Sequence, residues 1–299
     1  MIKILFNDGL EEELREKLIN DGILVCDKHY EEDELSKVLS EFDCIVIRSA
    51  TKIKTSLIDK VLGGRLKLII RAGVGMDNID VSYAKECGIE VLNTANASSN
   101  AVTELVLAHI FTLSRFMFRA NLTMKKGEWN KRLYTGLEIS GKTLGIIGMG
   151  RIGKVLADKA SALGMKVIYF NRSERHDIKS EYKAVTIEEL YKNSDFISLH
   201  VGGTETIISD DEINSMKDGV FIINTARASL IKTEALLVGI NSGKVAGAGI
   251  DVFDNEPRFS QALVNNTKIS ATPHIGASTV QAQGRIAEEV YKIIKDRFI

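Results

Sequence analysis

The feature of this 299-residue chain that most restricts its fold is an alternation of short apolar runs with helix-like stretches, which occurs twice. Residues 1–95 contain the runs IKILF, ILVC, CIVIR, LKLII and IEVLN, and residues 141–282 contain about six more, from TLGIIG to KISATPHI. Strands separated by helices are typical of parallel sheets, because a parallel connection needs a crossover. The sequence therefore predicts an α/β protein with two doubly wound parallel-sheet domains.

Two further helices are predicted outside this alternation. From Ser98 to Met124, apolar residues recur at helical spacing, which predicts one long helix between the two units with Asn100 as its cap. The segment QGRIAEEVYKIIKDRFI, at the end of the sequence, predicts another helix.

Composition narrows the class of partner. The 39 Lys and Arg residues nearly balance the 40 Asp and Glu residues, so charge favours neither nucleic acid nor a membrane surface as a partner. No apolar stretch is long enough to span a bilayer, and the N-terminus lacks the apolar core of a signal peptide.

Cys26, Cys44 and Cys87 show no metal-ligand spacing and are expected to be buried free thiols. We therefore expect a cytoplasmic protein without a metal site.

A glycine motif in the second unit indicates a nucleotide site. Gly148, Gly150 and Gly153 form GMGRIG, which matches GxGxxG and lies between the predicted strand TLGIIG and the predicted helix RIGKVLADKASALG. In that context the glycines permit a tight turn, and the unpaired N–H groups of the helix face a pyrophosphate. The motif predicts a bound dinucleotide, NAD or NADP.

The residues after the next predicted strand, KVIYF, bear on which dinucleotide is bound. An Asp or Glu normally accepts a hydrogen bond from the ribose of NAD at this place, but this chain has Asn171 and Arg172. An amide does not repel a 2′-phosphate, and a guanidinium can pair with one. NADP is thus favoured over NAD, although Arg172 could equally point to solvent or stack on adenine.

Hydride chemistry also needs a cation to orient the substrate and an acid to protonate the developing alkoxide. Arg227, Asp251, Glu256 and His274 follow predicted strands of the second unit, where ligands of open α/β sheets bind. Histidine suits proton transfer near neutrality, a carboxylate such as Glu256 would stabilise its imidazolium, and arginine pairs bidentately with a carboxylate. The only two prolines of the chain follow Glu256 and precede His274, and we interpret them as local stiffeners.

Several motifs, in order along almost the whole chain, resemble the D-isomer-specific 2-hydroxyacid dehydrogenases. They are RAGVGMDNID, EISGKTLGIIGMGRIG, NTARAS, GIDVFDNEP and TPHIGAST. The resemblance implies a catalytic trio of Arg227, Glu256 and His274, the residues that the chemistry nominates. Within the family, IRSATKIKTSLID and RAGVGMDNID are most similar to the short-form D-3-phosphoglycerate dehydrogenases.

The resemblance implies further binding residues. Arg48, Val74 and Gly75 would contact the substrate. The residues that it places near the cofactor, beside the three glycines and Asn171 and Arg172, are Arg151, Ile152, Thr225, Asp251 and Ala277.

The resemblance also implies an order of domains and an oligomer. A flavodoxin-like substrate domain would comprise residues 1–96 and 283–299, and a Rossmann nucleotide domain residues 97–282, with a cleft between them. The segment from Arg115 to Leu137 resembles the arm through which these proteins form homodimers, burying Trp129 and Tyr134. Lys131 and Arg132 are either a solvated face or a basic pair that reaches a neighbouring subunit's substrate phosphate.

Three functions fit this sequence, and the motifs favour the first. The first is oxidation of 3-phosphoglycerate to 3-phosphohydroxypyruvate, the entry to serine biosynthesis. The second is reduction of glyoxylate or hydroxypyruvate with NADPH, which Asn171 and Arg172 would suit. The third is a dinucleotide-responsive binding protein similar to the corepressor C-terminal-binding protein, which has the same fold and a similar trio.

Overall fold

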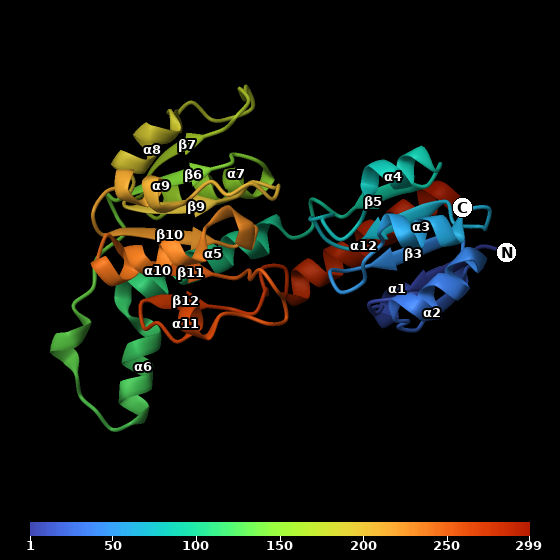
Figure 1. Ribbon diagram of the computed structural model, residues 1–299, viewed down its shortest axis with the longest axis horizontal. Helices are drawn as coiled ribbons and strands as arrows, with labels where there is room; N and C mark the ends of the chain where they lie inside the picture. The colour runs from blue at the N-terminus through green and yellow to red at the C-terminus, as the bar shows by residue number, and fades with distance from the viewer. The chain divides into compact units, whose positions relative to one another are not determined.

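The computed structural model describes residues 1–299 and divides them into two compact units (Figure 1). Unit 1 comprises residues 1–98 and 277–299, and unit 2 comprises residues 99–276. Each unit is built on one parallel sheet with helices on both faces. The predicted class, two doubly wound parallel α/β domains, is confirmed.

Unit 1 contains a five-stranded sheet in the order β2-β1-β3-β4-β5, which is the flavodoxin-like order. Its strands are β1 (Lys3–Phe6), β2 (Leu24–Asp27), β3 (Cys44–Ile47), β4 (Leu68–Arg71) and β5 (Glu90–Asn93). Its helices are α1 (Glu12–Asn20), α2 (Glu32–Val38), the 3-10 turn η1 (Leu39–Glu41), α3 (Thr55–Val61), α4 (Val81–Glu86) and α12 (Val280–Phe298).

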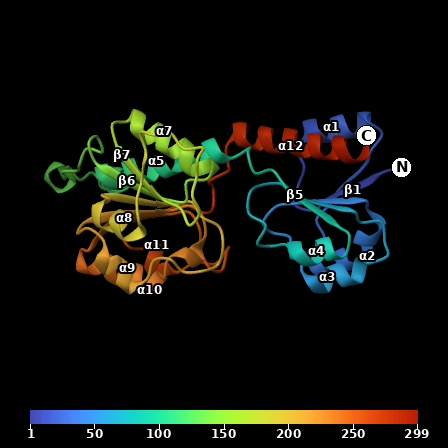
Figure 2. The ribbon, with the colours of Figure 1, turned by 90° about the horizontal axis from the view of Figure 1, so that it is seen from above.

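The two faces of this sheet are covered by different helices, as Figure 2 shows. Successive side chains of a strand point to opposite faces. Ile4 and Phe6 accordingly pack against α1 and α12, whereas Leu5 packs with residues of α2 and α3. Helix α12 lies at the end of the sequence, and it therefore completes the core of a unit that is otherwise formed by residues 1–98.

Unit 2 contains a seven-stranded sheet in the order β12-β11-β10-β9-β6-β7-β8. Its strands are β6 (Thr143–Ile147), β7 (Lys166–Phe170), β8 (Lys183–Ala184), β9 (Phe196–Leu199), β10 (Val220–Asn224), β11 (Val245–Ile250) and β12 (Ile269–Ala271). Its helices are α5 (Ser99–Arg115), α6 (Met117–Lys125), η2 (Lys131–Tyr134), α7 (Arg151–Ala162), α8 (Ile187–Asn193), α9 (Asp210–Ser215), η3 (Ala228–Leu230), α10 (Thr233–Ser242) and α11 (Gln261–Val264).

The centre of this sheet follows the Rossmann order, in which the chain reverses direction across the sheet between β6 and β9. Helices α5 and α7 cover one face, and α8, α9 and α10 cover the other (Figure 2). The sequence predicted about six strands here. It missed β8, because two exposed residues, Lys183 and Ala184, carry no apolar signal.

The long helix predicted from Ser98 to Met124 is two helices, so that prediction was wrong. The chain breaks at Phe116, whose φ of 54° lies in the left-handed region, and α5 and α6 are bent by 62°. No proline or glycine marks the break. The ring of Phe116 instead packs against Tyr134, 6.1 Å away between ring centroids, so a tertiary contact accompanies the turn.

The predicted cap of this helix was also wrong. The helix begins at Ser99, so Asn100 lies within its first turn and donates a hydrogen bond to Glu104 at 2.9 Å. No single helix has both the length and the apolar composition to span a membrane. Only the bent pair α5 and α6, taken together, meets those two criteria.

The packing of α12 against the first strand gives a test of the fold. Ile294 is fully buried in this interface, so Ile294→Ala should lower the free energy of unfolding of unit 1 by about 2–5 kcal/mol. Val280 lies on the same helix but is 86% exposed, and Val280→Ala should change it by less than about 0.5 kcal/mol. Urea unfolding with hydrogen exchange, resolved by segment, measures both. Equal effects of the two substitutions would contradict this packing.

Candidate active site

The three residues nominated for catalysis follow three neighbouring strands of unit 2. Arg227 follows β10, Glu256 follows β11 and His274 follows β12, and these strands pair in the order β10-β11-β12. Because all three strands are parallel, their carboxyl ends lie at one edge of the sheet. The glycine loop follows β6 of the same sheet, so it opens at the same edge.

His274 and Glu256 form a direct pair. Nδ1 of His274 lies 2.6 Å from Oε2 of Glu256, and Oε1 of Glu256 accepts a hydrogen bond from the backbone N–H of Phe253 at 3.0 Å. A carboxylate accepts only, so Nδ1 carries the proton and Nε2 is the ring nitrogen left for a substrate. The His274 side chain is 43% exposed, as a proton donor to a ligand must be. This is the arrangement of a general acid and its orienting carboxylate.

The backbone of His274 is held in an unusual conformation. Its φ of 53° lies in the left-handed region, which costs about 1–3 kcal/mol for a residue with a side chain. The buried carboxylate of Asp251 anchors the loop: Oδ1 accepts from the N–H of Ile275 and Oδ2 from the N–H of Gly276, both at 2.9 Å. Burial raises the pKa of Asp251, and these hydrogen bonds oppose that shift.

Asp251 was expected near the cofactor from the resemblance alone. In the structure its side chain is fully buried, and Oδ1 also accepts from the hydroxyl of Thr272 at 2.6 Å. Its anchoring of the His274 loop was not predicted. No local signal could have found it, because Asp251 lies 24 residues before Ile275 and 25 before Gly276 in the sequence.

Arg227 lies directly before the short turn η3. Its carbonyl accepts from Nδ2 of Asn224 at 2.8 Å, and its guanidinium donates to the carbonyl of Ala226 at 2.6 Å. Asn224 is buried at the end of β10 and also accepts from the N–H of Ala226. Asn224, at the end of β10, therefore fixes the backbone conformation at Ala226 and Arg227.

The glycine loop has the close packing that the motif predicts. Gly148 has a φ of 100°, and a Cβ there would lie 2.6 Å from the carbonyl oxygen of His200. A Cβ on Gly153 would lie 2.4 Å from the carbonyl oxygen of Gly148, so this glycine lets α7 approach β6. A Cβ on Gly150 meets nothing within 4 Å. Gly150 thus leaves open space at the N-terminus of α7, where Arg151 and Ile152 begin the helix.

Asn171 and Arg172 lie at the end of β7, as predicted. Oδ1 of Asn171 accepts from the N–H of Met149 at 2.7 Å, which ties the glycine loop to the neighbouring strand. Arg172 donates to Glu205 at 2.6 Å, and both side chains are about three-quarters exposed. The sequence reasoning missed Glu205, which lies in the loop after β9.

Two buried polar atoms at this edge indicate that the residues present fit a dinucleotide. Nδ2 of Asn171 and Oγ1 of Thr225 are buried and have no hydrogen-bond partner within the protein. Buried polar groups in native proteins are normally paired, so unpaired ones at a predicted site favour a ligand. Together with the open space beside Gly150, they fit a cofactor with polar groups along its length.

The residues that the resemblance assigns to the substrate lie in unit 1. Arg48 follows β3, and its N–H donates to the nearly buried carboxylate of Asp8 at 2.6 Å. Val74 and Gly75 follow β4, and the carbonyl of Val74 accepts from Nδ2 of Asn93 at 2.6 Å. Ala277, expected near the nicotinamide, also belongs to unit 1.

Two other histidines of unit 2, His109 and His200, have structural partners. His109 on α5 is only 2% exposed and contacts the hydroxyls of Ser270 and Thr272. His200 after β9 contacts the hydroxyl of Ser198 at 2.8 Å. Burial lowers the pKa of His109 and that of His200 to about 4, so both rings are neutral at neutral pH.

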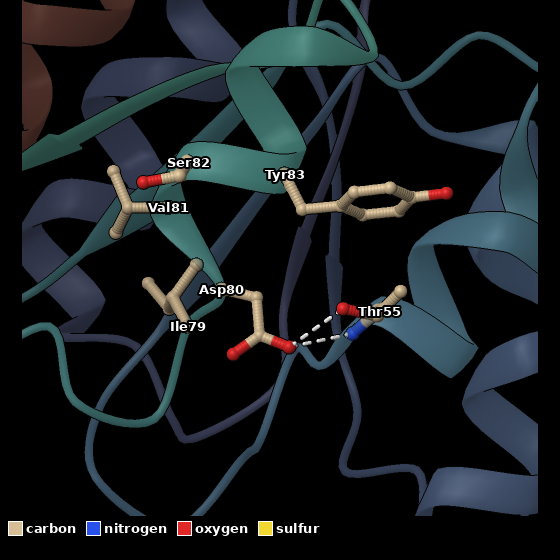
Figure 3. A pocket seen from close by; sticks show the side chains of 6 residues that line it. All are labelled: Thr55, Ile79, Asp80, Val81, Ser82 and Tyr83. Carbon is tan, nitrogen blue, oxygen red and sulfur yellow. Dashed lines mark hydrogen bonds between the residues drawn. The ribbon is translucent and has the colours of Figure 1, made fainter.

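Unit 1 also has a pocket of its own, shown in Figure 3, which is lined by Thr55 and by residues 79–83. Its carboxylate, Asp80, accepts from the N–H and the hydroxyl of Thr55 and pairs with Lys54, which lowers the pKa of Asp80. Asp80 therefore satisfies the first turn of α3, and its bonds are accounted for by the fold.

The chain is similar to several known proteins over most of its length. Residues 107–276 match the family described as D-isomer specific 2-hydroxyacid dehydrogenase, NAD binding domain. A hydroxypyruvate reductase of Thermotoga maritima is 45% identical over 98% of both chains. A D-3-phosphoglycerate dehydrogenase of Bacillus subtilis is 38% identical over 97% of this chain, which spans 56% of that protein's length. A solved acyclic imino acid reductase in complex with NADPH and D-Arg is 31% identical, covering 99% of this chain and 96% of that one, with a TM-score of 0.91.

The different surroundings of the loop glycines predict different effects of adding a methyl group. Gly150→Ala should leave the unfolding temperature unchanged, because the methyl meets open space, but should weaken dinucleotide binding by about tenfold, about 1.4 kcal/mol. Gly153→Ala should lower the unfolding temperature, because its methyl would overlap the Gly148 carbonyl. Calorimetry of unfolding and of NADH and NADPH binding separates the two. A Gly150→Ala protein that bound both dinucleotides as well as the wild type would contradict the assignment.

Burial of neutral His109 predicts a pH dependence of stability. Its folded pKa of about 4 lies below its ordinary value of 6.5, so the unfolded chain binds the proton more readily. The contribution of neutral His109 to the free energy of unfolding is therefore fully present above pH 6.5. It is lost as the pH falls toward 4, and the loss is on the order of 3 kcal/mol. The free energy of unfolding should fall less steeply across this window in His109→Leu than in the wild type, as measured by urea titration at each pH. Parallel curves would exclude a depressed pKa.

Proposed function

Because the chain belongs to the D-isomer-specific 2-hydroxyacid dehydrogenase family, we propose that its reaction is the reduction of hydroxypyruvate to D-glycerate. As a member of that family it is an oxidoreductase that acts on the CH–OH group of a D-2-hydroxy acid, with NAD or NADP as cofactor.

His274 is the general acid of the proposed reaction. Its Nδ1 proton is held by Glu256, so Nε2 of the imidazolium donates a proton to the oxygen of the substrate carbonyl. The reduced nicotinamide, when bound, supplies the hydride to the carbonyl carbon. Glu256 keeps the ring in one orientation and stabilises its positive charge before the proton leaves.

Arg227 orients the substrate. Its planar guanidinium matches the carboxylate of a 2-keto acid bidentately, and its charge also polarises the neighbouring carbonyl. We propose that Val74 and Gly75 add backbone N–H groups to the same carboxylate, and that Arg48 contacts the far end of the substrate.

The choice of an unphosphorylated substrate rests on one observation. The hydroxypyruvate reductase of Thermotoga maritima is 45% identical and matches this chain over 98% of both lengths. The phosphoglycerate dehydrogenase of Bacillus subtilis is 38% identical. The higher identity thus supports the reductase over the phosphoglycerate enzyme, which the motifs IRSATKIKTSLID and RAGVGMDNID favour.

A second candidate function, oxidation of 3-phosphoglycerate, is supported by a pair of cations. Lys131 and Arg132 are both exposed on η2, next to the exposed Trp129. If this segment meets a second subunit, the pair would be available to a substrate phosphate there. The family motifs IRSATKIKTSLID and RAGVGMDNID also favour this substrate.

We propose NADP as the preferred cofactor. The acid that would repel a 2′-phosphate is replaced by Asn171, whose Nδ2 is a buried donor without a partner. Arg172 adds a positive charge beside it, although Glu205 pairs with this guanidinium and partly neutralises it. For NADP to bind in this way, Arg172 must break its ion pair with Glu205 and pair with the 2′-phosphate instead.

We also propose a cytoplasmic homodimer that is joined through α6 and the segment that follows it. No residue of α6 is buried, and Met117, Phe118, Trp129 and Leu133 expose 59–79% of their surface. Figure 1 shows α6 extending away from the sheet of unit 2. Large exposed apolar side chains of this kind mark interaction surfaces.

The test is the initial rate of reduced-nicotinamide consumption with hydroxypyruvate, glyoxylate and 3-phosphohydroxypyruvate, each with NADH and NADPH. We expect hydroxypyruvate with NADPH to give the highest kcat/KM. His274→Ala should lower kcat by about 10² to 10⁴ while dinucleotide affinity is unchanged, because only the proton donor is removed.

A preference of at least about a hundredfold for 3-phosphohydroxypyruvate, about 2.7 kcal/mol of differential transition-state binding, would establish the second candidate instead. Undiminished turnover by His274→Ala would remove this residue from the mechanism. Absence of turnover on every acid would contradict both candidates and return the dinucleotide-responsive binding protein to consideration.

A further inference from the structure

His109 is a buried titratable side chain that the proposed mechanism does not use. It stands on α5, far in sequence from the catalytic residues, and packs directly on the sheet. A Cβ on Gly249 would lie 2.7 Å from the Cβ of His109, so β11 has no side chain where this ring rests. Residues two apart on a strand share a face, so Asp251 and Gly249 face the same side of the sheet.

The ring of His109 contacts two hydroxyls of the neighbouring strand segment. Nδ1 lies 2.9 Å from Oγ of Ser270, and Nε2 lies 3.2 Å from Oγ1 of Thr272. Ser270 pairs with Gly249 in the parallel register, and Thr272 follows two residues later on the same face. The histidine therefore spans two hydroxyls on the strand segment that ends at His274.

Proton counting gives this network one direction. The single hydroxyl proton of Thr272 is donated to Oδ1 of Asp251 at 2.6 Å, so Oγ1 can only accept from His109. Nε2 of His109 must then carry the proton. In the neutral ring Nδ1 is consequently an acceptor, and the hydroxyl of Ser270 donates to it.

Asp251 connects these hydrogen bonds to the loop of His274. Beyond the hydroxyl of Thr272, its carboxylate accepts from the N–H groups of Ile275 and Gly276, which directly follow His274. These bonds hold His274 at a φ of 53°, which an unsupported loop would avoid. A hydrogen-bonded chain thus runs from Ser270 through His109, Thr272 and Asp251 to the backbone that carries the catalytic ring.

We propose that His109 is a positioning residue for catalysis: as the Nε2–H tautomer it orients Thr272 and Asp251, which hold the loop of His274 in its left-handed conformation. This proposal rests on the proposed function for the role of His274. His109 would thus be a buried residue on α5 that helps to position the proton donor His274. Small displacements of a catalytic group have large effects on rate, so loss of this support should reduce turnover.

The first measurement needs no substrate. Nitrogen-15 NMR of the histidine rings should show His109 with the proton on Nε2 and without a change of charge between pH 8 and pH 5.5. The amide signals of Ile275 and Gly276 should shift in His109→Leu and remain in place in Ser114→Ala. Ser114 lies on the same helix and has a buried hydroxyl without a hydrogen-bond partner, so it is the matched control.

The second measurement is steady-state kinetics on the best 2-keto acid. His109→Leu should lower kcat by about tenfold while KM and the dinucleotide Kd stay within about twofold, because the loop rather than either binding surface is altered. His109→Gln should recover most of the rate, since its Nε2 can donate to Thr272, whereas the shorter side chain of His109→Asn should not. Ser270→Ala is a smaller change at the far end of the hydrogen-bonded chain, and it should also lower kcat.

The outcomes are separable. A proton on Nδ1, unmoved Ile275 and Gly276 amides, or a wild-type kcat in His109→Leu would each overturn the positioning role. Equal rates for His109→Gln and His109→Asn would also count against it, since only the first restores the donor. If the wild type reduces none of the acids, the proposed function fails, and the NMR results decide the hydrogen-bonded chain by themselves. If His109→Leu does not fold, the same amide shifts and rates in Ser270→Ala decide it.

Discussion

The proposed catalytic edge of unit 2 depends on the buried carboxylate of Asp251 and the hydrogen bonds that it accepts. Two of these come from the backbone N–H groups that follow His274, and a third comes from Thr272. A carboxylate is the natural group here because it offers only acceptors, and several donors converge on it. Its burial is unfavourable by itself, and the hydrogen bonds compensate for it.

The same edge is assembled by parallel pairing. Each of β10, β11 and β12 delivers one member of the trio, because parallel strands all end on the same side of the sheet. The glycine loop after β6 opens on that side as well, and Asn171 ties it to β7 through the N–H of Met149. The residues that we propose for nucleotide binding and for proton transfer therefore share one sheet, although they are widely separated in sequence.

Helix α5 connects packing with chemistry. It covers one face of the sheet with apolar side chains such as Val106 and Ile110, as an ordinary crossover helix does. At His109 the same helix reaches the hydroxyls of Ser270 and Thr272 through the space that Gly249 leaves. A glycine in the middle of a strand usually weakens it, so its presence here indicates a close approach that the site uses.

The sequence by itself determined the class of fold and nominated the glycine loop and the trio, because these depend on local signals. Apolar periodicity marks strands and helices, glycine marks tight turns, and residue chemistry marks acids, cations and imidazoles. Only the tertiary structure decided where the long helix breaks, because Phe116 turns where its ring meets Tyr134. It alone also decided that Asp251 anchors the His274 loop and that His109 supports Thr272, since hydrogen bonds between distant strands and helices depend on distances that no spacing in the chain records.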